Sequence, residues 1–137
     1  LSPYLSLSSD NGNTIVDGPS FNKNMGISFW VLGNENKSLL SQGSYEIKTL
    51  NKKIVFSFGQ DRFTSSDELT LGKNHVVVSI GTVSTMYVNG QYSGASESFS
   101  SFVSSGNLTI GEIDNLMIFN KSLDLNSAKG LYNSQLE

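Results

Sequence analysis

The chain has 137 residues, a formal net charge of −3 and no cysteine. This length allows a single domain, residues 1–137, with an apolar core that needs no disulfide bonds, and the lack of cysteine excludes a thiolate metal site. The nine lysine and arginine residues are scattered, and no run approaches the ~20 apolar residues of a membrane span, so we expect neither nucleic acid binding nor membrane insertion.

In the first half of the chain, apolar and polar residues alternate over short runs, which is the pattern of half-buried β-strands. Segments rich in Gly, Asn and Asp separate these runs and favour turns. In the clearest run, Ile27, Phe29 and Val31 share one face. We predict strands over residues 4–8, 14–16, 27–32, 39–41, 45–50 and 54–58.

The strongest turn signal in the second half is Asn89-Gly90, a pair that favours the type I′ turn of a two-residue hairpin. It predicts that residues 91–93 run antiparallel to residues 86–88. Residues 96–106 are rich in serine and fit either a strand or a packed loop. Further strands are predicted over residues 75–80, 107–110 and 113–119.

Asp124 can cap a short C-terminal helix, whose apolar face would carry Leu125, Ala128, Leu131 and Tyr132 at helical spacing. Many short strands, frequent turns and one terminal helix indicate an all-β fold in which two antiparallel sheets pack as a sandwich. The residues expected in its core are Ile27, Phe29, Val31, Ile54, Phe56, Val76, Val78, Met86, Val88, Leu116 and Ile118.

Four motifs, in the same order, resemble the laminin-G-like, concanavalin A-like jelly-roll domains of lectin type. They are GISFWV at residues 26–31, HVVVS at 75–79, MYVNG at 86–90, and IGEIDNLMIFNKSL at 110–123 followed by a helix ending in Leu-Tyr. The resemblance implies a jelly-roll sandwich over most of residues 26–132. This chain departs from the family at Lys73-Asn74, where a tryptophan usually precedes the strand. The fold itself implies no single function, because lectins, adhesion modules, glycosidases and spacers share it.

The acidic residues Glu112 and Asp114 invite comparison with jelly-roll glycosidases of the laminarinase type. Those enzymes carry Glu-x-Asp-x-Glu or Glu-x-Asp-x-x-Glu on one strand, because retaining hydrolysis needs two carboxylates ~5 Å apart on one face. Here Leu116 and Met117 stand where the second catalytic acid would be. His75 is the only histidine and no Gly-x-Ser-x-Gly turn exists, so we predict no catalytic residues and read His75 as a strand residue.

A calcium site is a second hypothesis. The resemblance implies Asp114 as a ligand, since many domains of the family hold one Ca²⁺ beside the aspartate of the last strand. Asp10 and Asn13, in an N-terminal loop, supply the hard oxygen atoms that Ca²⁺ prefers. The alternative is structural: Asp114 accepts backbone N–H groups and Asp10 makes an Asx turn.

Sugar binding is the third hypothesis, because lectin sites combine an aromatic platform with amide and carboxylate groups. Alternatively, Trp30 packs under a neighbouring segment, and Asp61 and Arg62 only balance each other in an exposed turn. Asn-x-Ser/Thr sequons at Asn36, Asn107 and Asn120 matter only in a eukaryotic secretory pathway. The candidate ligand-binding residues are Trp30, Asn34, Tyr45, Asp61, Arg62 and Tyr92.

Together these observations predict a non-catalytic recognition module of a surface protein, binding a glycan or a protein partner in adhesion or in phage or virus receptor binding. The alternative is a structural decoration or spacer domain that assembles with neighbouring chains. We expect an extracellular, cell-surface or virion-surface location. The chain begins with Leu1 rather than methionine, so we also expect it to be a piece of a longer protein.

Overall fold

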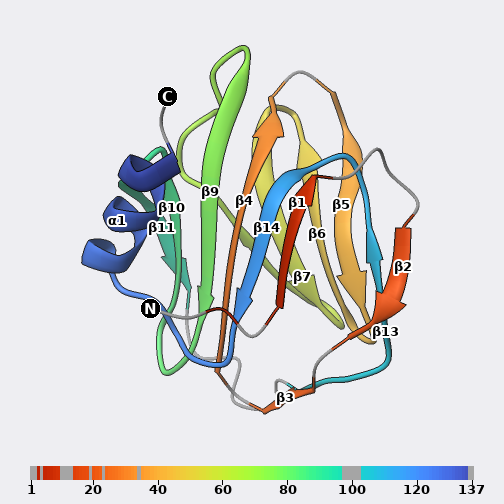
Figure 1. Ribbon diagram of the computed structural model, residues 1–137. Helices are drawn as coiled ribbons and strands as arrows, with labels where there is room; N and C mark the ends of the chain where they lie inside the picture. The colour runs from red at the N-terminus through yellow and green to blue at the C-terminus, as the bar shows by residue number, and fades with distance from the viewer. Residues whose placement is uncertain are drawn as a thin grey trace.

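The computed structural model describes residues 3, 5–9, 14–18, 20–22, 24–33, 35–96 and 103–135. Two six-stranded antiparallel sheets face each other, and one helix lies outside the first sheet (Figure 1). The first sheet has the order β1 (Leu5–Ser9), β14 (Asp114–Phe119), β4 (Met25–Leu32), β9 (Lys73–Ile80), β10 (Ser84–Val88) and β11 (Gln91–Ser96). The second has the order β2 (Thr14–Asp17), β13 (Asn107–Ile110), β5 (Lys37–Gln42), β6 (Tyr45–Leu50), β7 (Lys53–Phe58) and β8 (Asp61–Thr64). A small ribbon pairs β12 (Val103–Ser104) with β3 (Phe21–Asn22).

The core lies between the two sheets and confirms the predicted face assignments. Alternate residues of each strand point inward, so Ile27, Phe29 and Val31 meet Ile54 and Phe56 from the opposite sheet. Every residue predicted for the core is buried except Val88, which is partly buried and packs against the others.

Helix α1 (Leu125–Gln135) covers part of the outer face of the first sheet (Figure 1). Its Ala128 packs in a second apolar cluster with Val77, Tyr87, Phe119 and Leu123. This cover explains why the last strand is apolar on both faces: Leu116 and Ile118 enter the main core, whereas Phe119 faces the helix.

Asp124 caps the helix as predicted. Its Oδ1 accepts the backbone N–H of Ser127 at 2.8 Å, and this backbone hydrogen bond lowers the pKa of the Asp124 carboxyl. The helix continues three residues beyond Tyr132, where the sequence placed its end.

One turn forms as the sequence predicts, and another is shorter than predicted. Asn89 and Gly90 have φ values of 53° and 77° and join β10 to β11 in a two-residue hairpin, as predicted. The sequence places Asp61 and Arg62 in a turn, but they belong to β8, where Arg62 pairs with Ser57. The connection between β7 and β8 contains only Gly59 and Gln60, because Gly59, at φ 61°, allows a two-residue turn.

Two further observations concern segments that the sequence left open. Of the serine-rich residues 96–106, the structure describes β12 and its connection to β13, and residues 97–102 lie outside the described part. Within the described part of the chain, no helix is long and apolar enough to cross a membrane.

Candidate ligand pocket

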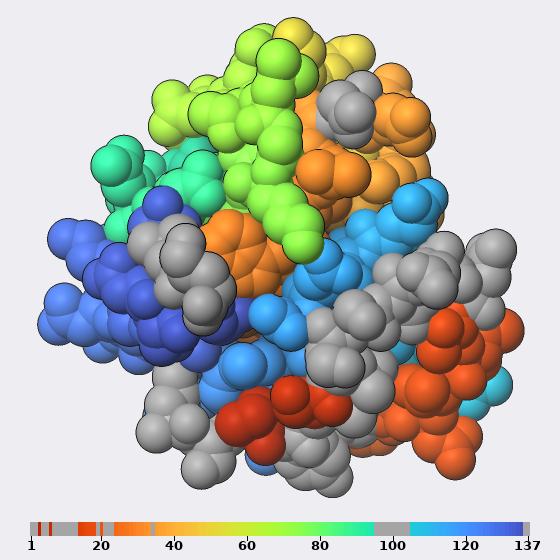
Figure 2. Space-filling model, turned by 45° about the horizontal axis from the view of Figure 1, so that its top comes forward, coloured from red at the N-terminus to blue at the C-terminus, as the bar shows by residue number. Residues whose placement is uncertain are grey.

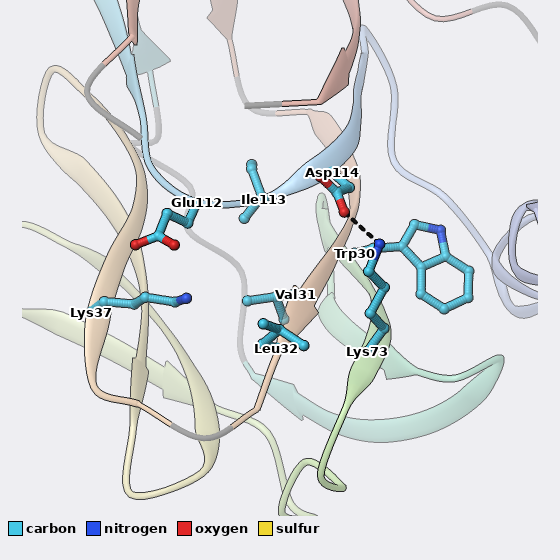
Figure 3. A pocket seen from close by; sticks show the side chains of 8 residues that line it. All are labelled: Trp30, Val31, Leu32, Lys37, Lys73, Glu112, Ile113 and Asp114. Carbon is cyan, nitrogen blue, oxygen red and sulfur yellow. Dashed lines mark hydrogen bonds and ion pairs between the residues drawn. The ribbon is translucent and has the colours of Figure 1, made fainter. Parts of the chain in front are cut away.

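A pocket of about 120 Å³ lies at one end of the sandwich, where β4 ends and β5, β9 and β14 begin. Figure 2 is turned toward this end and shows the green segment that leads into β9 beside the orange segment of β4, with the light-blue segment of β14 next to them. The pocket is lined by Trp30, Val31, Leu32, Lys37, Lys73, Glu112, Ile113 and Asp114 (Figure 3).

The crossing from β13 to β14 places the acidic residues at this end. At Gly111 the backbone lies so close to the Ser38 carbonyl that a side chain would not fit, and its N–H donates to the Leu39 carbonyl at 2.8 Å. Ile113 then turns into the core, so the flanking Glu112 and Asp114 remain at the surface. A bulge follows, with Asn115 at φ 51° and a shift in the pairing between β14 and β4.

The charged side chains occupy two opposite flanks of the pocket (Figure 3). On one flank, the Lys73 Nζ donates to the Asp114 Oδ2 at 2.7 Å. On the other, Glu112 and Lys37 point toward each other. Between the flanks lies an aliphatic floor of Val31, Leu32 and Ile113, in which Val31 and Ile113 are buried. The pocket therefore offers hydrogen-bond acceptors, donors and an apolar surface at once.

Trp30 lines the edge of this pocket, but its indole points away from the centre, beyond the Lys73–Asp114 pair (Figure 3). Its Nε1 donates to the Gln135 Oε1 at 2.8 Å, and its ring centroid lies 5.9 Å from that of Tyr132 on the same helix. The tryptophan thus packs under α1, with its indole turned away from the pocket.

His75 lies next to Trp30 in the register of β4 and β9, with ring centroids 5.0 Å apart. It is fully buried, and its Nε2 is 2.8 Å from the Ser28 Oγ. Burial lowers the pKa of His75 to about 4, because the charged imidazolium would lose its hydration. A serine and a histidine that are both sealed from solvent present no nucleophile to a substrate.

The other predicted sugar-binding residues do not gather at the pocket. Tyr45 corrects the prediction: its ring is 1% exposed and stacks on Phe56, so it serves the core and offers no platform. Burial also raises the pKa of the Tyr45 hydroxyl. Arg62 is exposed on β8, and Tyr92, 58% exposed, lies on β11. Asn34 is outside the described residues.

The described residues do not fit a calcium site at Asp114. The ammonium group of Lys73 already contacts the Asp114 carboxylate, and Ca²⁺ requires six to eight oxygen ligands. No group of three or more acidic, histidine or cysteine side chains able to hold a metal occurs within the described ranges. Asp10 and Asn13, the other predicted ligands, lie outside those ranges.

The pocket brings together two of the predicted site residues, Trp30 and Asp114, which pair across β4 and β14. Sequence reasoning missed Lys37 and Lys73 as site residues and considered Glu112 only as a catalytic acid. The one available signal was the change from tryptophan to Lys73-Asn74, because Lys73 starts the strand beside β4. Lys37 gave no signal, since it comes from the opposite sheet.

No protein-family model matches this chain, and no curated protein matches its sequence. Among solved structures, the botulinum neurotoxin type G receptor-binding domain has a TM-score of 0.73 at 12% identity, over 98% of this chain and 52% of that one. A structure of botulinum neurotoxin type C, whose cell entry depends on interaction with two ganglioside molecules, gives 0.73 at 17% identity, over 96% and 42%. The serotype D ligand-binding domain in complex with N-acetylneuraminic acid gives 0.72 at 17% identity, over 95% and 42%.

At these identities the similarity concerns the fold alone. This chain spans about half, or less, of the length of those toxin domains. The chain therefore has the β-sandwich architecture found in receptor-binding domains of botulinum neurotoxins.

Proposed function

We propose that this chain is a non-catalytic recognition module that binds a glycan or a protein surface. The observation that supports it is the pocket at the end of the sandwich, where Asp114, Glu112 and two lysines surround an aliphatic floor. Polar groups converging on an apolar concave surface are the usual composition of a ligand site. The similar toxin structures agree in kind, since they are receptor-binding domains, one in complex with N-acetylneuraminic acid and another with rat synaptotagmin II.

We also propose where the protein acts and which domains it descends from. A receptor-binding role fits an extracellular or secreted protein, at a cell surface or on a virus particle. The laminin-G-like motifs favour descent from the jelly-roll lectin-type domains. A spacer role is the alternative, and no specific contact of the described residues favours it.

A glycan array carrying neutral and sialylated oligosaccharides tests the proposal. We expect binding of at least one glycan class by the parent chain and weaker binding by Asp114→Asn, which keeps the size of the side chain and removes its charge. Ser57→Ala, on the outer face of the second sheet away from the pocket, serves as the matched control and should bind like the parent. If the parent binds no glycan and no cell surface, the spacer role replaces the recognition role.

A further inference from the structure

The Lys73–Asp114 pair at the pocket supports an inference about how a ligand is held and what it is. We propose that Lys73 supplies, beside Asp114, the positive charge that calcium supplies in metal-dependent domains, and that the pocket binds one neutral sugar ring without metal. This inference rests on the proposed recognition function and adds the chemical class of the ligand.

The register of the strands brings Lys73 and Asp114 to opposite sides of β4. β4 pairs with β14 on one side and β9 on the other, so Asp114 lies opposite Trp30 while Lys73 lies opposite Leu32. Asp114 and Lys73 therefore approach β4 from either side near its end, and the lysine side chain spans β4 to reach the carboxylate at 2.7 Å. The lysine side chain remains 61% exposed, which leaves its other N–H groups able to donate to a ligand oxygen.

The charges that line the pocket favour a neutral ligand. Lys37 and Lys73 carry two positive charges and Glu112 and Asp114 carry two negative ones, so the lining is formally neutral. A carboxylate ligand would face two carboxylates, and an amine ligand would face two ammonium groups. A neutral sugar avoids both conflicts, because its hydroxyls donate to the carboxylates and accept from the lysines.

The volume of the pocket limits the size of the ligand. The pocket volume is about 120 Å³, and an engineered protein cavity of ~150 Å³ is known to hold benzene. A hexopyranose has twice as many heavy atoms as benzene, so the pocket can receive only part of one sugar ring. Its C–H face would rest on Leu32, the exposed member of the aliphatic lining, so the pocket suits the terminal residue of a glycan and not an internal stretch of chain.

The test uses Trp30, the only tryptophan, as a reporter at the edge of the pocket. Methyl β-D-galactopyranoside, methyl α-D-glucopyranoside, methyl α-D-mannopyranoside and N-acetylneuraminic acid are titrated while the indole ¹H–¹⁵N signal is followed by NMR. We expect at least one neutral pyranoside to shift the signal, with the same Kd in millimolar calcium and in chelator. N-acetylneuraminic acid should shift it less at equal concentration.

Variants then separate the role of Lys73 from general effects. Lys73→Met keeps the aliphatic stem and removes the ammonium, and we expect at least about tenfold weaker binding, as for the loss of one charged hydrogen bond. Glu112→Gln provides a second variant within the lining, with a weakening in the same direction. Lys48→Met, on the outer face of the second sheet, is the control and should bind like the parent.

The outcomes distinguish the two proposals. Binding that needs calcium, that survives Lys73→Met unchanged, or that prefers N-acetylneuraminic acid overturns the inference while the recognition function stands. A melting temperature of the free protein that rises in calcium and returns in chelator also overturns it, since ligand binding to the folded state would then include the metal. If the titrations and the glycan array show no binding but the parent binds a cell surface, the inference fails and the recognition function stands. If the parent also binds no cell surface, both fail.

Discussion

The buried side chain of His75 makes the stability of this fold depend on pH. Its imidazole lies on β9 beside the rings of Trp30 and Tyr132, at centroid distances of 5.0 and 5.9 Å, and its Nε2 pairs with the Ser28 hydroxyl. The Nδ1 atom has no hydrogen-bond partner within the part of the chain that the structure describes. Protonation would add a charge that this surrounding cannot solvate.

The first prediction is therefore a loss of stability in mild acid. The pKa of His75 is about 4 in the folded chain and 6.5 in an ordinary environment. The unfolded chain thus binds more protons between pH 6.5 and 4. The contribution of His75 to the free energy of unfolding is fully present above pH 6.5. It is lost as the pH falls toward 4, by at most about 1.4 kcal/mol per pH unit.

Urea denaturation of the parent and of His75→Gln at several values between pH 7.5 and 4.5 measures this effect. The difference in free energy of unfolding between the two proteins should shrink as the pH falls, because glutamine does not titrate. Curves that stay parallel over this range would show that the imidazole is hydrated in solution.

At the scale of elements, helix α1 depends on the hairpin between β10 and β11. Gly90, at φ 77°, lies under the ring of Tyr132, and a Cβ added there would be 2.9 Å from the Tyr132 Cδ2. Gly59, in the hairpin between β7 and β8, has a similar φ of 61°, but an added Cβ would meet nothing within 4 Å. The two glycines differ in their contact with the helix, while their backbone conformations are alike.

The second prediction compares Gly90→Ala with Gly59→Ala. Both substitutions place a side chain at positive φ, which costs about 1–2 kcal/mol. Gly90→Ala should lower the free energy of unfolding more than Gly59→Ala, because it also pushes Tyr132 and the helix off the sheet. Chemical denaturation gives both losses, and equal values would mean that α1 shifts without cost.

At the scale of the whole molecule, β14 is covered on both faces. Leu116 and Ile118 enter the core between the sheets, and Met117 and Phe119 pack against the cluster under α1. The strand that carries Asp114 therefore lines no open cleft along its length, and only its first residue reaches the pocket. A retaining glycosidase needs a second carboxylate ~5 Å away along such a cleft.

The third prediction is that the chain does not hydrolyse β-glucans. Laminarin incubated with the parent protein should release no reducing sugar above the buffer control. Turnover by the parent that is lost in Glu112→Gln would contradict the non-catalytic function. The covered faces of β14 make that outcome unexpected on structural grounds.

Local sequence determined the elements of this protein and which face of each strand is buried. The alternation around Phe29 and Phe56, the Asn89-Gly90 turn and the Asp124 cap act over a few residues, so each predicted its element correctly. The period-two pattern also made the two-sheet sandwich the economical architecture, because each strand had one apolar face to cover.

Only the tertiary structure decided which side chains share the pocket. Lys73 meets Asp114 because β9 and β14 flank β4, and Lys37 arrives from the other sheet. It also assigned Tyr45 to the core and Trp30 to the underside of α1, although both are aromatic residues on strands. The physical reason is that strand order and sheet packing join residues far apart in sequence, whereas alternation and turn signals report only on near neighbours.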